Sequence, residues 1–169
     1  MDSFDEASVA GKRAVDLLPH DAEAINNLGN TFLHLGKVEQ AKDSFEKAIS
    51  LEPDYAEASN NLGTLFRELN NLDRAEVFFR KAISSNPKYP EPHFNLGALL
   101  LDLGRASEAE MSFLRALELN PSYAKAYINL ASIYSERGCL EAARDLLEQS
   151  LLVDSSYSQA HNNLGNTLV

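Results

Sequence analysis

The chain of 169 residues has one cysteine, two methionines and no tryptophan, and it has no long apolar run. Because Cys139 stands alone, the sequence excludes an intrachain disulfide and a metal site built from cysteines. No segment approaches the roughly 20 consecutive apolar residues that a membrane-spanning helix requires, so we expect no membrane partner. The acidic start Met1–Glu6 also lacks the basic and apolar segments of a secretion signal. These absences favour a cytoplasmic protein.

Positive charge is scarce as well. The 15 Lys and Arg residues are outnumbered by 25 Asp and Glu residues, which gives a formal net charge of −10. Phosphate recognition needs clustered cations, so we expect no nucleic-acid partner. The four histidines are isolated in the sequence, and no Gly-rich phosphate loop follows a strand pattern. We therefore predict no catalytic residue, no metal site and no cofactor, in a chain that is not itself an enzyme.

What the sequence does contain is a repeat with a period of 34 residues. A Leu-Gly pair recurs at that spacing, with Leu-Ala in the remaining place: Leu28-Gly29, Leu62-Gly63, Leu96-Gly97, Leu130-Ala131 and Leu164-Gly165. A fixed period of this length is typical of a solenoid in which each repeat contacts its neighbours. Apolar residues at steps of three and four indicate two amphipathic helices in each repeat. Counted from six residues before each pair, the complete repeats are 22–55, 56–89, 90–123 and 124–157.

The turn between the two helices of each repeat has its own signal. Gly36 follows the first helix of repeat one, and its place is taken by Asn70, Gly104 and Gly138 in the later repeats. Glycine adopts a left-handed backbone without penalty, and asparagine tolerates it best among the other residues. We therefore expect a left-handed residue at each of these turns.

Small residues alternate with a large ring in the predicted core. Gly29 in the first helix and Ala41 and Ala48 in the second would let the two axes approach closely, with Phe45 filling the remaining space. Repeats two and three keep this arrangement. Repeat four has Leu147 in place of the phenylalanine, so it is the least regular.

The repeat resembles the tetratricopeptide repeat, whose 34-residue signature is W-x₂-L-G-x₂-Y, then A-x₃-F, then A and P. Only the leading tryptophan is missing, and its place is taken by Ile25, Ser59, His93, Tyr127 and His161. The resemblance implies an all-α fold, a right-handed superhelical solenoid of antiparallel helix pairs without strands. It also implies that the first helices line a concave groove that binds a protein or peptide segment.

Both ends of the sequence stop within a repeat. Residues 4–20 fit only the second helix of a partial repeat, and residues 158–169 fit only the first helix of another. Solenoids normally carry a polar capping helix at each end. We therefore expect this chain to be a piece of a longer protein. The alternative is self-association, with an open end that pairs with another copy.

The sixth position of every repeat is asparagine: Asn27, Asn61, Asn95, Asn129 and Asn163. A side-chain amide carries a donor and an acceptor, so it matches the N–H and C=O of one residue in an extended peptide. This row resembles the asparagine ladder of the tetratricopeptide region of O-linked N-acetylglucosamine transferases, which implies a grip on peptide backbones. The alternative is that the amides bond between repeats and stiffen the stack.

Neighbouring positions complete the predicted peptide site. Asn26, Asn30 and Asn60 would add amides, and Phe94 with Ile128 would form an apolar pocket at the centre of the groove. The two-carboxylate clamp of chaperone-binding relatives is excluded, because its cationic positions hold Asn26, Glu91 and Asn95 instead of Lys or Arg. The sequence therefore predicts a peptide-binding scaffold. The alternatives are the substrate-recruiting arm of a larger enzyme, such as a glycosyltransferase, and a self-associating structural element.

Overall fold

The computed structural model describes residue 13 and residues 19–167. These residues form nine α-helices and no strand, so the predicted all-α class is confirmed. Most of the second helix predicted over 4–20 lies outside the described residues. The chain divides into two compact units, one ending at Pro87 and the other beginning at Lys88. None of the described helices combines the length and the apolar character that crossing a membrane requires.

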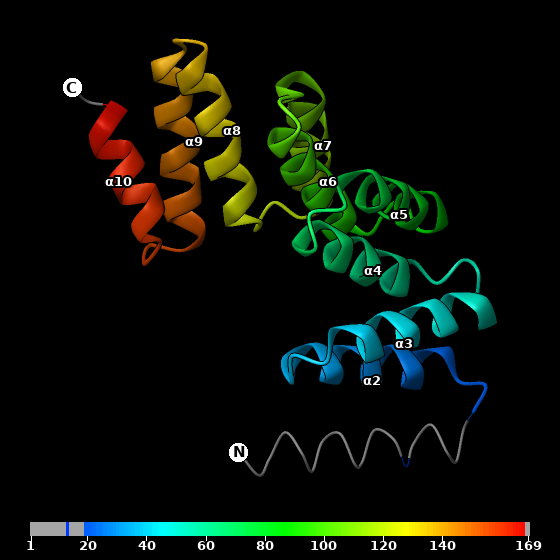
Figure 1. The fold of residues 1–169 in the computed structure, drawn as a ribbon. Helices are drawn as coiled ribbons and strands as arrows, with labels where there is room; N and C mark the ends of the chain where they lie inside the picture. The colour runs from blue at the N-terminus through cyan, green and yellow to red at the C-terminus, as the bar shows by residue number, and fades with distance from the viewer. Residues whose placement is uncertain (1–12, 14–18, 168–169) are drawn as a thin grey trace. The chain divides into compact units, whose positions relative to one another are not determined.

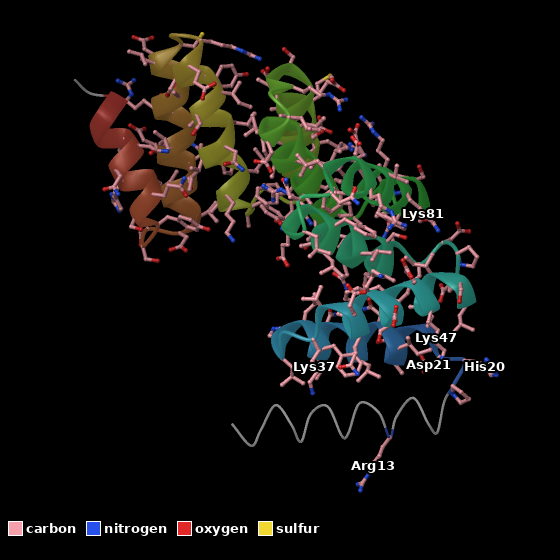
Figure 2. The ribbon with its side chains drawn as sticks, viewed as in Figure 1. Arg13, His20, Asp21, Lys37, Lys47 and Lys81 are labelled. Carbon is pink, nitrogen blue, oxygen red and sulfur yellow. The ribbon has the colours of Figure 1, made fainter. Side chains whose placement is uncertain are left out.

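Unit 1 consists of two helix pairs. Its helices are α2 (Ala22–His34), α3 (Val38–Leu51), α4 (Ala56–Glu68) and α5 (Leu72–Ser85). Each packs against the next in the chain, and α2 also contacts α4. Figure 2 shows Asp21, at the start of α2, and Lys47, near the end of α3, at one end of the first pair, while Lys37 marks the other end. The two helices of that pair are therefore antiparallel.

Unit 2 consists of two further pairs and a single last helix. Its helices are α6 (Pro90–Asp102), α7 (Ala106–Leu119), α8 (Ala124–Glu136), α9 (Leu140–Val153) and α10 (Ser158–Thr167). Sequential helices pack together here too, and α10 contacts both α8 and α9 (Figure 1). The first helices of the two units begin at residues 22, 56, 90, 124 and 158, which is the 34-residue period of the sequence.

The turns within the helix pairs adopt the expected left-handed conformation. The φ angles are 68° at Gly36, 57° at Asn70, 71° at Gly104 and 77° at Gly138. In the first of them, the N–H of Lys37 donates to the carbonyl of Phe32 at 2.8 Å, so the left-handed residue closes the helix end in a Schellman-type turn. The sequence signal thus identified how each pair reverses its direction.

A close contact between glycine and phenylalanine fixes the spacing of three pairs. Phe45, Phe79 and Phe113 are fully buried. A Cβ atom on Gly63 would lie 2.7 Å from Cδ1 of Phe79, and the equivalent glycines of the other two pairs show similar distances of 2.6 Å and 2.7 Å to the nearest ring carbon. Since no side chain fits there, the ring rests directly on the backbone of the first helix.

Repeat four solves the same packing problem with a different pair of residues. Ala131 stands in the place of the glycine and Leu147 in that of the phenylalanine, and both are buried. A leucine lacks the ring atoms that would meet the alanine Cβ. The two departures from the pattern, separated by 16 positions in the sequence, therefore compensate each other across the α8–α9 contact.

We predict that Gly63→Ala lowers the free energy of unfolding by about 1–3 kcal/mol, because the added Cβ forces the Phe79 ring out of its place. The double variant Gly63→Ala/Phe79→Leu copies repeat four and should be less destabilised than the sum of its single changes by about 1 kcal/mol. Denaturant unfolding followed by circular dichroism measures both. Gly165→Ala is the control, since its Cβ would meet no described atom within 4 Å; equal losses at residues 63 and 165 would contradict the packing argument.

Candidate functional site

The five asparagines of position six occupy one equivalent place on each first helix, but their environments differ. Asn27 on α2 is exposed, whereas Asn61, Asn95, Asn129 and Asn163 are partly buried. The helices hold them in register because each first helix begins at the same point of the repeat. The hydrogen bonding of Asn61 differs from that of Asn129 and Asn163, as described below.

In unit 1, one member of the row forms a bond between repeats. Nδ2 of Asn61 on α4 donates to Oδ1 of Asn26 on α2 at 3.0 Å. Asn26 is only 2% exposed and Asn60 only 6%. The sequence predicts that both line an open surface, and the structure instead places them where little of either side chain is accessible. The Asn61 amide is thus used in stacking the repeats, as the structural alternative predicts.

For Asn129 and Asn163 in unit 2, position five of the preceding repeat is apolar, so the equivalent bond cannot form. Asn129 and Asn163 follow Phe94 and Ile128 at the same separation of 35 residues that joins Asn26 and Asn61. Neither hydrocarbon side chain accepts a hydrogen bond. Within the described part of the chain, the amides of Asn129 and Asn163 have no hydrogen-bond partner.

Phe94 and Ile128 pack within the unit and do not form an open pocket. The Phe94 ring stacks on Tyr123, with centroids 4.7 Å apart, and lies 5.6 Å from that of Phe113. Burial, with Glu91 nearby, raises the pKa of Tyr123 to about 12. Ile128 is 1% exposed and belongs to the core cluster that contains Leu147. Ile128 therefore offers almost no surface to a ligand, whereas Phe94 is partly buried and keeps some exposed surface.

A cavity that the sequence analysis missed lies among α8, α9 and α10. Its volume is about 290 Å³, and we call it the α8–α10 cavity. Seven described residues line it: Ala131, Ser132, Ser135, Glu136, Leu140, Leu147 and Asn163. It brings the Asn163 amide together with the irregular pair of repeat four. The sequence did contain a signal for this cavity: Ala131 and Leu147 replace the glycine and phenylalanine of the other repeats.

Helix α8, which carries Asn129, is anchored to α7 by a carboxylate. Glu110 accepts hydrogen bonds from the Tyr134 hydroxyl at 2.8 Å and from the Arg137 guanidinium at 2.6 Å. The bond from Tyr134, followed by that from Arg137, lowers the pKa of Glu110 below its usual value. This network ties the surface of repeat four to the preceding repeat.

Acidification should weaken this anchor. Because the pKa of Glu110 is lower in the folded state, its stabilising contribution is complete above the ordinary carboxyl pKa and is lost as the pH falls through the lowered value. We expect Glu110→Gln to reduce the melting temperature at pH 7. The difference in melting temperature between the variant and the parent should become smaller as the pH is lowered to about 3. Thermal unfolding across this range measures the effect; parallel curves for the two proteins would contradict the prediction.

Comparison with known proteins agrees with the repeated helix pairs. Models described as tetratricopeptide repeat match residues 26–90, and residues 78–111 and 112–145. The chain belongs to the tetratricopeptide repeat family. No curated protein matches the sequence closely enough to count as a relative.

Several solved structures are similar to this chain, and two of these, YrrB and TTC0263, are described as tetratricopeptide repeat proteins. MamA has a TM-score of 0.77 at 23% identity, over 92% of this chain and 91% of its own. YrrB, described as having an unusual peptide-binding site, has a TM-score of 0.77 at 23% identity, and the match covers 94% of this chain and 81% of YrrB. TTC0263, a protein of Thermus thermophilus, has a TM-score of 0.77 at 24% identity, and the match covers 98% of this chain and 90% of TTC0263. At these identities the likenesses show the fold alone.

The bond between Asn61 and Asn26 predicts unequal effects of one substitution at two equivalent positions. Asn61→Ala should lower the free energy of unfolding by about 1–3 kcal/mol, because it leaves the buried Asn26 oxygen without its donor. Asn27→Ala, at the exposed equivalent, should change it by less than about 0.5 kcal/mol, with a gain in helix propensity. Guanidinium unfolding compares the two variants.

A second substitution, added to Asn61→Ala, tests whether the loss of stability comes from the hydrogen bond between Asn61 and Asn26. Asn26→Ile combined with Asn61→Ala copies the apolar position five that Ile128 provides in repeat four, and should recover part of the lost stability. If the single Asn61 and Asn27 variants were equally stable, the bond would have no measurable role.

Proposed function

We propose that this chain binds an extended peptide segment of a partner protein, and that the side-chain amides of Asn129 and Asn163 in unit 2 hold the peptide backbone. Membership in the tetratricopeptide repeat family supports the general class, a protein-interaction scaffold. The observation that carries the finer proposal is the contrast within the asparagine row. The Asn61 amide bonds to Asn26, while those of Asn129 and Asn163 have no partner in the described chain.

The energetic argument follows from partial burial. An amide that is partly withdrawn from water and has no protein partner loses hydrogen bonds that a ligand can restore. Each amide offers one acceptor and two donors, which fit the N–H and C=O of a peptide residue. One such residue in each repeat would hold a backbone with little regard to the side chains of the peptide.

The regular spacing of the first helices supports a linear ligand. Asn129 and Asn163 stand at the same position of successive repeats, on α8 and α10 of one compact unit. An extended peptide also presents its backbone groups at regular intervals. These groups have no internal hydrogen bonds, so they are free to bond with side-chain amides. The peptide-binding site described for YrrB concerns that protein, and it supports only the idea that a fold of this kind accommodates a peptide.

The double variant Asn129→Ala/Asn163→Ala tests the proposal. Peptides selected from a random displayed library against the parent chain are synthesised, labelled and titrated by fluorescence anisotropy. We expect the variant to bind them about 10- to 100-fold more weakly, because two to four hydrogen bonds of about 0.5–1.5 kcal/mol each are lost. Gln149→Ala, which removes an exposed amide from α9, is the matched control and should leave the affinity unchanged.

Two further measurements separate recognition of the peptide backbone from recognition of its side chains and from a loss of fold. N-methylation of single peptide bonds should weaken binding more than replacement of the corresponding side chains by methyl groups. Circular dichroism should show the same helix content for parent and variant. Unchanged affinity in the double variant would contradict the proposal, and a particle size that rises with concentration would favour self-association instead.

A further inference from the structure

We infer that the α8–α10 cavity binds the side chain of an arginine or lysine in the peptide that unit 2 holds. This inference rests on the proposed function and adds to it the class of side chain that the surface selects. The observations that carry it are the composition of the cavity floor, the kind of polar group at its edge and the pairing of the nearby charges.

The floor of the cavity is apolar, and repeat four alone of the complete repeats combines the residues that form it. Ala131 and Leu147 are no more than 1% exposed, and they replace the glycine and phenylalanine that pack directly together in the other three pairs. Leu140, at the start of α9, is 50% exposed and stands at the mouth. Such a cavity suits the aliphatic stem of a long side chain whose charged end remains near solvent.

The polar groups around the cavity present acceptors. The Ser132 hydroxyl donates to the carbonyl of Ile128 at 3.2 Å, so its remaining capacity is to accept. The Glu136 carboxylate, exposed on α8, is a pure acceptor when ionised. The Asn163 amide adds one oxygen. Ammonium and guanidinium groups are pure donors, so they complement this set better than a neutral or acidic group would.

The charge of Glu136 is not neutralised by the described part of the chain. The cation that follows it, Arg137, bonds to Glu110 on α7 instead. A cationic ligand would therefore meet an unpaired carboxylate, on a protein whose net charge is −10. The volume of about 290 Å³ is close to the lower limit of about 300 Å³ for small-molecule sites, which suits one side chain of a peptide.

Four matched probes test this inference with the full chain. Each is a fluorescein-labelled nine-residue peptide of alanine and serine that differs only at its centre, which is arginine, lysine, leucine or glutamate. Fluorescence anisotropy should show the arginine and lysine peptides binding about 5-fold more tightly than the leucine peptide, and the glutamate peptide binding most weakly. The advantage of the basic peptides should shrink at high salt.

Two variants of the protein assign the preference to this cavity. Glu136→Gln should remove most of the advantage of the basic peptides and leave the leucine peptide unaffected, whereas Glu68→Gln, at the same position of repeat two, should change nothing. Ala131→Gly/Leu147→Phe restores the pair that repeats one to three use, so it should fold with full helix content. It fills part of the cavity and should weaken the arginine peptide about 10-fold.

The outcomes distinguish this inference from the proposed function. Asn129→Ala/Asn163→Ala should weaken all four probes, whereas Glu136→Gln should weaken only the basic ones. Equal affinity for the four probes, tightest binding of the leucine peptide, or no binding of the arginine peptide at millimolar concentration would each overturn the assignment of the cavity to a basic side chain. In each of those cases, the library-selected peptides still test whether Asn129 and Asn163 bind the peptide backbone.

Discussion

The direct contact between a glycine backbone and a phenylalanine ring sets the geometry of three helix pairs. With 2.6–2.7 Å between an added Cβ and the nearest ring carbon, the first helix has no freedom to carry a side chain there. The second helix must present a flat ring at that place. The position of each first helix on its partner follows from this contact, and so does the direction in which its other residues face.

Repeat four shows what happens when that constraint is relaxed. Alanine replaces the glycine and leucine replaces the ring, so the two helices still pack, with both side chains buried. Both replacement side chains line the cavity that Asn163 also lines. A change that leaves the fold intact thus gives repeat four a different pair of residues at this place.

In the asparagine row, one residue type at one repeated position has two kinds of surroundings. In unit 1 a neighbouring amide at position five captures the side chain of Asn61, and the pair stabilises the stacking of α2 and α4. For Asn129 and Asn163 in unit 2, the corresponding residues are Phe94 and Ile128, which pack against other side chains and leave these two amides unpaired within the described residues. The residue at position five of the preceding repeat, 35 positions earlier, therefore decides whether the amides of Asn61, Asn129 and Asn163 bond within the described part of the protein.

Local signals in the sequence were enough to predict the helices and the turns between them. The 34-residue period, the apolar spacing and the left-handed positions at Gly36 and Asn70 are properties of short segments, and each segment folds by rules that depend on its own residues. The burial of Asn26, the packing of Phe94 and the cavity beside Leu147 depend on which side chains of other helices lie opposite. Sequence alone determined the repeated helix pair, because backbone geometry and hydrophobic spacing are local; only the tertiary structure decided which polar groups remain unpaired, because that depends on contacts between repeats.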